Sequence, residues 1–201
     1  MWLSDSVRLR TSAGASTGWR RRSSSPRSTP AAKPAMRSSG LETSSTQQPD
    51  RVVTAPTWGG NLEILHWTLA VGRWIRPAKD YAGCVLILET SEEIPSSEEV
   101  FRILRNMGER GLLAQFPAVV FGTAKATSID RPVSPDKREP YRTAQRDAVL
   151  AAFEAYHPEA MIVFNVDIGH TDPQWVLPYG GSLTVDGPAR TITASYGLPN
   201  S

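Results

Sequence analysis

The stretch CVLILET at residues 84–90 decides the fold class. Its apolar side chains follow one another without alternation, which is typical of a strand buried on both faces, as in parallel sheets. Two more runs of this kind lie downstream, FPAVVFG at residues 116–122 and MIVFNV at residues 161–166. Helical patterns separate the three runs. The order predicts an α/β fold with a parallel sheet.

Two amphipathic helices are predicted between these strands. The segment PSSEE at residues 95–99 starts the first one, because acids in the first turn suit the helix dipole. Its apolar face consists of Val100, Ile103, Leu104 and Met107. The second helix covers residues 141–157, after a polar loop at 123–140, and we expect it to pack through Ala144, Ala148, Leu150, Ala151 and Phe153.

Secondary structure can also be predicted for the segments on either side of these strands. Upstream, LEILHWTLAVGRWI at residues 62–75 predicts a helix with Asn61 as its N-cap. Downstream, GSLTVDG at 181–187 and ARTITASY at 189–196 predict a terminal β ribbon, with hairpin chemistry at Asp186-Gly187.

Residues 1–54 are predicted to be a disordered Ser/Arg-rich tail, and residues 55–201 the folded domain. The first 50 residues carry a net charge of +5, whereas residues 51–201 carry −3. The tail has too little apolar surface to offset chain entropy. A nucleic-acid-binding arm, an organellar transit peptide and a segment translated out of frame are alternatives for it. Because the folded part is acidic, we expect no nucleic-acid partner.

Composition excludes several classes of protein. The single cysteine, Cys84, rules out an internal disulfide. No apolar run approaches the length of a membrane span, and the N-terminus lacks the apolar region of a signal peptide. We therefore expect a cytoplasmic protein without a membrane partner.

Two strand ends carry the candidate catalytic residues. Glu89 ends the first buried strand, and His170 follows the third in NVDIGHTDP at residues 165–173. Loops beyond the carboxyl ends of strands are where α/β proteins build sites, and a histidine held by a carboxylate is the base half of a nucleophilic triad. A structural histidine and a loop-capping glutamate explain the same residues. Glu92 and Glu93 are expected to be solvated.

A nucleophile is harder to find. Ser182 lacks the glycine pattern of a nucleophile elbow, Ser91 is more natural as a turn residue, and Cys84 is expected to be an inert core thiol. The histidines show no metal-ligand spacing, and no Gly-rich phosphate loop occurs, so neither a metal nor a cofactor is expected.

Several long motifs together resemble one family. WGGNLEIL, VLILETSEEIPSSEEVFRILRNMGERGLL, FPAVVFG and FNVDIGHTDPQWVLPYGG follow in the order seen in the LD-carboxypeptidase family of serine peptidases, in the branch of the microcin C self-immunity peptidase. The resemblance runs from about Thr57 to Tyr196. It implies the C-terminal, swivelling-type α/β domain of that family, closed by the β ribbon.

The resemblance also implies roles. It places the glutamate and histidine of a Ser-Glu-His triad on Glu89 and His170, with a peptide or peptidyl-nucleotide substrate and a possible homodimer. The family's serine lies on a Gly-X-Ser-Asp turn in a preceding domain, and this chain has no such sequence. We therefore expect half of a serine carboxypeptidase, inactive alone and dependent on a separate nucleophile domain. A non-catalytic remnant or interaction module is the alternative.

Overall fold

The computed structural model describes residues 46–195, with side chains from residue 48 onward. Most of the predicted tail, residues 1–45, lies outside them. The expected boundary near residue 54 differs from the observed one, because a strand already begins at Val52. Residues Val52–Thr54 belong to the fold because they pair with Asp186–Thr184 of the terminal ribbon.

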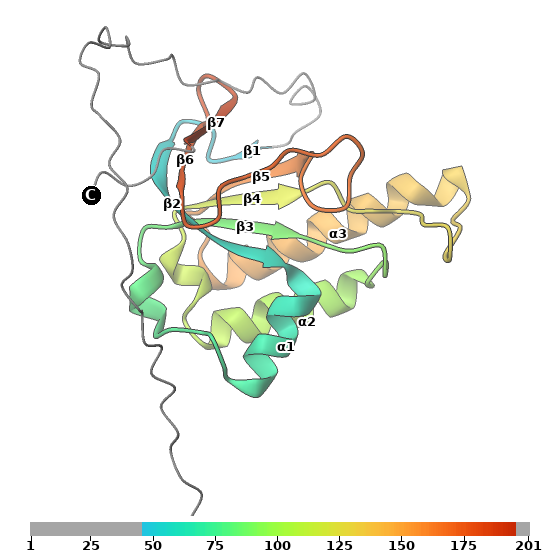
Figure 1. Ribbon diagram of the computed structural model, residues 1–201, viewed down its shortest axis with the longest axis horizontal. Helices are drawn as coiled ribbons and strands as arrows, with labels where there is room; N and C mark the ends of the chain where they lie inside the picture. The colour runs from blue at the N-terminus through green and yellow to red at the C-terminus, as the bar shows by residue number, and fades with distance from the viewer. Residues whose placement is uncertain (1–45, 196–201) are drawn as a thin grey trace, which may run out of the picture. The chain divides into compact units, whose positions relative to one another are not determined.

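Within the described residues, the strands form one seven-stranded sheet in the order β1-β5-β4-β3-β2-β6-β7 (Figure 1). Strands β2 to β5 are mutually parallel, whereas β1, β6 and β7 run antiparallel to their neighbours. The three buried runs are confirmed as strands β3, β4 and β5. The bounds are β1 Thr46–Gln47, β2 Val52–Asn61, β3 Val85–Glu89, β4 Ala118–Gly122, β5 Met161–Val166, β6 Ser182–Asp186 and β7 Thr191–Ser195.

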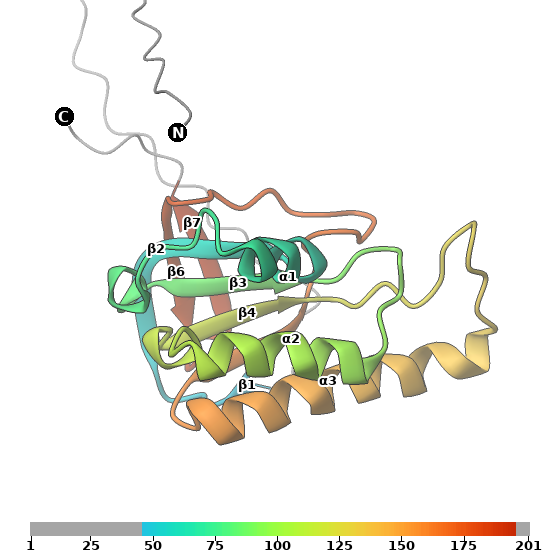
Figure 2. The ribbon, with the colours of Figure 1, turned by 90° about the horizontal axis from the view of Figure 1, so that it is seen from below.

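In the part of the chain that the structure describes, three α-helices pack against one face of the sheet. They are α1 Leu62–Val71, α2 Ser97–Glu109 and α3 Pro135–Tyr156, and two short 3-10 turns cover Ala78–Tyr81 and Leu113–Gln115. Figure 2 shows α2 and α3 side by side along the strands. Alternate strand residues, among them Leu86, Leu88 and Phe121, form the core beneath the helices. The predicted apolar face of α2 is confirmed, and all four of its residues are buried.

The terminal ribbon covers part of the opposite face. Strand β2 is long enough to pair with two partners: Thr57–Asn61 runs along β3, and Val52–Pro56 runs along β6. This switch brings β6 and β7 over the sheet, where Leu183 and Val185 pack against Val120 and other strand residues. The predicted ribbon is confirmed, with a turn over residues 187–190 between its strands.

Helix α3 departs from the prediction at its start and on its buried face. It begins at Pro135, six residues early, because proline is favoured in the first turn and Ser134 is extended like an N-cap. Its buried residues are Gln145, Val149, Ala152 and Phe153, so of the expected set only Phe153 is fully buried. The side-chain amide nitrogen of Gln145 donates a hydrogen bond to the Pro95 carbonyl at 2.6 Å, which satisfies one end of the buried amide.

Candidate active site

The carboxyl ends of the parallel strands place the site. Strand β3 ends at Glu89, and Glu89 lies opposite Asn61, the last residue of β2. Asn61 is also the N-cap of α1, since its side chain accepts a hydrogen bond from the amide of Ile64, as predicted. The chain leaves β5 at Val166 and reaches His170 at the same edge of the sheet.

The two predicted site residues come together. Nδ1 of His170 lies 2.8 Å from Oε2 of Glu89, although 81 positions separate the residues in the chain. The Glu89 side chain is only 11% exposed, and that of His170 is 38% exposed. A carboxylate only accepts hydrogen bonds, so Nδ1 carries the proton of this contact. The contact fixes the orientation of the ring.

Two glycines make room for the Glu89 carboxylate. A Cβ at Gly169 would lie 2.3 Å from Oε2 of Glu89, and Gly169 has a φ of +78°. A Cβ at Gly122 would lie 2.9 Å from Cβ of Glu89. Any side chain at Gly169 would therefore have to displace the carboxylate. The backbone after β5 can pass this close to Glu89 because these positions lack side chains.

A second carboxylate occupies the other side of the ring. Oε2 of Glu92 lies 2.9 Å from Nε2 of His170, and the Glu92 side chain is 57% exposed. Glu92 is exposed, as expected, and its carboxylate also contacts the ring, which the sequence did not predict. Burial lowers the pKa of His170, but the hydrogen bond and charge of Glu89, together with the charges of Glu92 and Glu63, outweigh it and raise that pKa above its ordinary 6.5.

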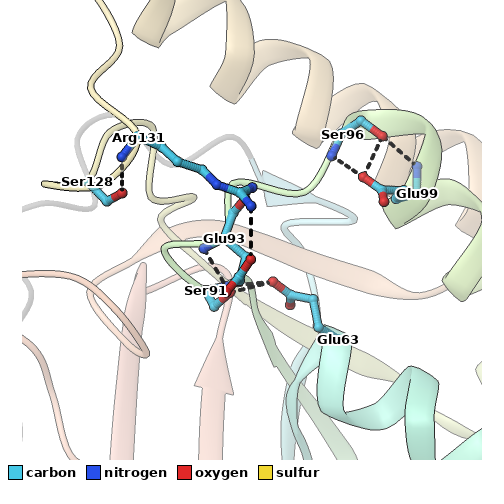
Figure 3. Close-up of polar contacts among 7 residues, drawn as sticks. All are labelled: Glu63, Ser91, Glu93, Ser96, Glu99, Ser128 and Arg131. Carbon is cyan, nitrogen blue, oxygen red and sulfur yellow. Dashed lines mark hydrogen bonds and ion pairs between the residues drawn. The ribbon is translucent and has the colours of Figure 1, made fainter.

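The loop after β3 is held at several points (Figure 3). Oε1 of Glu63, in the first turn of α1, accepts hydrogen bonds from the amide and the hydroxyl of Ser91 at 3.0 and 2.7 Å. Ser91 Oγ in turn accepts from the amide of Glu93, whose carboxylate lies 3.2 Å from Arg131. Ser91 thus has the contacts of a turn residue, as expected.

The next helix starts under its own cap, also visible in Figure 3. The hydroxyl of Ser96 accepts a hydrogen bond from the amide of Glu99, while the Glu99 carboxylate accepts from the amide of Ser96 at 2.7 Å. This reciprocal capping box fixes where α2 begins. The loop of residues 90–95 is therefore anchored at both ends.

An open groove of about 850 Å³ runs beside the histidine. Of the groove-lining residues that the structure describes, Ser91 alone carries a hydroxyl, and no cysteine lines the groove. Cys84 is only half-buried and packs against the edge of the core, and burial raises the pKa of its thiol. The lining consists of Asn61, Glu63, Ile64, His66, Trp67, Ser91, Glu93, Ile94, Pro95, Glu99, Arg102, Ile103, Arg131 and His170.

Comparison with known proteins places the fold. Residues 54–185 match the family model of the LD-carboxypeptidase C-terminal domain. The chain belongs to this family. The match includes most of β2, the strands β3 to β5, the three helices and most of β6, and both candidate residues lie within it.

Solved structures agree with this assignment. An MccF-like protein from Streptococcus pneumoniae, solved with AMP, is 23% identical with a TM-score of 0.57, over 72% of this chain and 41% of its own. The microcin C7 self-immunity protein MccF is 20% identical with a TM-score of 0.56, over 79% and 42%. MccF has also been solved with aspartyl sulfamoyl adenosine. No curated protein matches the chain.

This LD-carboxypeptidase C-terminal domain spans less than half the length of the solved proteins it resembles. Within residues 46–195, no three His, Cys, Asp or Glu side chains gather in a way that could hold a metal ion. None of the helices described is both long and apolar enough to cross a bilayer. What the sequence reasoning missed is the set of residues around the histidine, namely Glu63, Glu92 and Arg131. The position of Glu63 in the first turn of α1, next to the predicted N-cap, could have indicated that it lies near the strand ends.

Proposed function

We propose that this chain is the half of a serine carboxypeptidase active site that carries the base. Glu89 and His170 are the glutamate and histidine of its Ser-Glu-His triad. The observation that carries the proposal is the 2.8 Å contact between Nδ1 of His170 and the nearly buried Glu89 carboxylate, on a ring that lines an open groove. A buried orienting carboxylate, a histidine and adjoining space for a substrate are three of the parts that such a site requires, besides the serine and the oxyanion donors.

The chemistry assigns one task to each residue. Nε2 of His170 takes the proton of a serine hydroxyl as its oxygen attacks the carbonyl carbon of the scissile bond, and later returns a proton to the leaving amine. Glu89 holds the Nδ1 proton and stabilises the imidazolium between these steps. The chain alone is inactive in this scheme, because the serine and the oxyanion donors that contribute much of the rate belong to another domain.

The surface of α1 supports a partner domain. Ile64, Trp67 and Val71 lie at helical spacing and are exposed, and Trp74 just beyond the helix is 79% exposed. Ile64 and Trp67 also line the groove, so this apolar row continues directly into the site. Exposed tryptophans of this kind are enriched at the centres of protein interfaces. We assign the row to the domain that carries the serine. A second copy of this chain is the competing occupant.

The substrate class follows from the neighbours and the groove. The solved relatives bind AMP and an aminoacyl sulfamoyl nucleoside. The groove offers Trp67 for stacking and Arg102 for a phosphate or carboxylate. We propose a cytoplasmic hydrolase of peptides with a free carboxylate, either murein-type LD-peptides or peptidyl-nucleotides.

The first step of the test is a search of the upstream DNA for the serine domain. The sequence upstream is translated in all three frames and searched for a domain with Gly-X-Ser-Asp. That domain is co-expressed with this chain, and release of D-alanine from a murein tetrapeptide and of aspartate from aspartyl sulfamoyl adenosine is measured. We expect hydrolysis of one of them by the pair and none by either part. The His170→Gln and Glu89→Gln variants should each lose about a thousandfold or more in kcat.

The matched control is His157→Gln, which changes a histidine at the end of α3 that does not line the groove. It should leave activity unchanged. Activity that survives in His170→Gln overturns the triad. A self-associating chain whose dimer is abolished by Trp67→Ser, with no hydrolysis in any combination, would indicate an interaction module instead.

A further inference from the structure

We infer that Glu92 is a latch on the catalytic base: its carboxylate closes over Nε2 of His170 and has to leave before that nitrogen can accept a proton from a hydroxyl. The inference rests on the function proposed above and adds a means of regulating the same site. The starting observation is the 2.9 Å contact between Oε2 of Glu92 and Nε2 of His170.

The two contacts of the ring define its protonation state. Nδ1 faces Glu89 and Nε2 faces Glu92, and ionised carboxylates have no hydrogen to donate. The two contacts are therefore favourable together only when both ring nitrogens carry a proton, so Glu92 holds the imidazolium form of the ring. A general base needs a lone pair on Nε2. The latched arrangement therefore cannot start the reaction, whichever domain supplies the hydroxyl.

The two carboxylates differ in their freedom to move. Glu89 is only 11% exposed and lies close against Gly122 and Gly169, so little free space surrounds its side chain. Glu92 is more than half exposed, and its contact with His170 is the one polar contact that the described part of the chain gives its carboxylate. Release of Glu92 therefore requires only a side-chain rotation.

The loop backbone supports this division. On one side of Glu92, Ser91 is tied to Glu63 by two hydrogen bonds. On the other side, the carbonyl and the carboxylate of Glu93 both accept hydrogen bonds from the Arg131 guanidinium. The backbone at Glu92 is thus held on both sides, while its side chain is free to rotate. The groove can therefore keep its shape when the Glu92 carboxylate leaves His170.

Loss of one proton opens the latch. When the Nε2 proton passes to water, its electron pair stays on nitrogen and faces an anionic oxygen, so attraction becomes repulsion and Glu92 turns into solvent. Glu89, Glu92 and Glu63 raise the pKa of His170 against burial. Glu93 and Glu99, and the cations Arg102 and Arg131, also line the groove. The latch is closed in acid and opens as pH rises through the raised pKa.

The experiment uses the full chain and needs no catalysis. The His170 ring is titrated by NMR in the wild type, in Glu92→Gln and in Glu93→Gln, and exchange of the Nε2 proton with water is measured at pH 5.5. Glu93→Gln is the matched control, since it removes the same charge from the adjacent residue, which is 71% exposed and contacts Arg131 instead.

We expect Glu92→Gln to lower the pKa of His170 by about half a unit, the size of a partly exposed ion pair, and to speed Nε2 proton exchange several-fold. Glu93→Gln should change both much less. Equal shifts in the two variants, or exchange in the wild type as fast as in Glu92→Gln, would overturn the latch.

A second readout separates this inference from the triad itself. With the co-expressed serine domain, Glu92→Gln should move the acidic limb of kcat/KM to lower pH by the same half unit. An unmoved limb in an active pair contradicts the latch and leaves the triad standing. If no pair is active, the proposed function fails, whereas the NMR experiment still decides whether Glu92 holds Nε2.

Discussion

The two sides of the His170 ring are built in different ways. On the Nδ1 side, Glu89 ends a central strand, is almost buried and is enclosed by two glycines. On the Nε2 side, Glu92 lies in a loop and reaches the ring from solvent. Both contacts have nearly the same length, 2.8 and 2.9 Å, so distance alone would rank them equally.

The difference shows which contact positions the ring. Burial of a carboxylate costs free energy unless the carboxylate accepts a hydrogen bond, so Glu89 needs the hydrogen bond from Nδ1 of His170. An exposed carboxylate is well hydrated without a partner, so Glu92 gains little from staying. The packed side fixes orientation, and the open side controls access.

The largest effect is expected on the packed side, from Gly169→Ala. The new Cβ would stand 2.3 Å from Oε2 of Glu89, at a residue with a φ of +78°. We expect a loss of about 2–4 kcal/mol in the free energy of unfolding, from backbone strain and a broken charge-assisted hydrogen bond. Urea denaturation measures the loss. The NMR chemical shifts of the His170 ring should also change, because the ring loses its hydrogen bond to Glu89.

Gly180→Ala provides the control for this experiment. Gly180 has a similar φ of +71°, but its added Cβ meets nothing within 4 Å. It should lose about 1 kcal/mol from strain alone and leave the His170 signal unchanged. If both variants lose the same free energy, the contact with Glu89 contributes nothing to the cost, and the packed side is no tighter than an ordinary turn.

A smaller effect is expected where the open side is anchored, from Ser91→Ala. This change removes the hydroxyl that donates to Glu63 and accepts from the amide of Glu93. We expect a loss of about 1 kcal/mol in the free energy of unfolding, the net value of such hydrogen bonds. Ser91→Thr keeps the hydroxyl and should recover most of it. A threonine variant as unstable as the alanine variant would mean that the hydroxyl is not what anchors the loop.

Strand ends made Glu89 and His170 candidates from sequence, and the family resemblance implied their pairing, whereas nothing pointed to the contact of Glu92 with the ring. Glu89 and His170 could be found because each follows a run of apolar residues whose strand ends share one edge of the sheet. Helix α2 was predictable for a similar reason, since its apolar spacing and its capping residues agree with each other. The contact of Glu92 with the ring depends on one side-chain rotation in a loop, and no periodic pattern encodes that.

Strand β2 escaped prediction because its composition opposes a strand. It contains Pro56 and the pair Gly59-Gly60, which normally indicate a turn. Pro56 lies where β2 changes partner from β6 to β3. A Cβ at Gly59 would lie 1.9 Å from the Ile87 carbonyl oxygen, so a glycine is needed for β2 to approach β3. Pro56 and Gly59 are tolerated in β2 because the strand pairs with segments far away in the sequence. Local residue propensities do not describe such pairing.

The smallest expected effect is a pH dependence that joins the two sides. The pKa of His170 is raised above 6.5 in the folded chain. Below pH 6.5 the ring is protonated in both the folded and the unfolded chain, and its contacts with Glu89 and Glu92 contribute fully while those carboxylates are ionised. As pH rises through the raised folded value, the folded ring loses its proton and the contribution disappears.

Urea denaturation at pH 6 and pH 9 measures this contribution in the wild type and in His170→Gln. The wild type should lose about 0.2–1 kcal/mol more than the variant between these pH values, a small amount because the ring is partly exposed. His157 titrates in both proteins, and its effect therefore cancels in the difference. In Glu92→Gln this loss should be smaller, because the pKa of His170 is raised less, but part of it should persist on the Glu89 contact. If that loss vanishes with Glu92, the open side and not the packed side holds the charged ring, and the comparison is reversed.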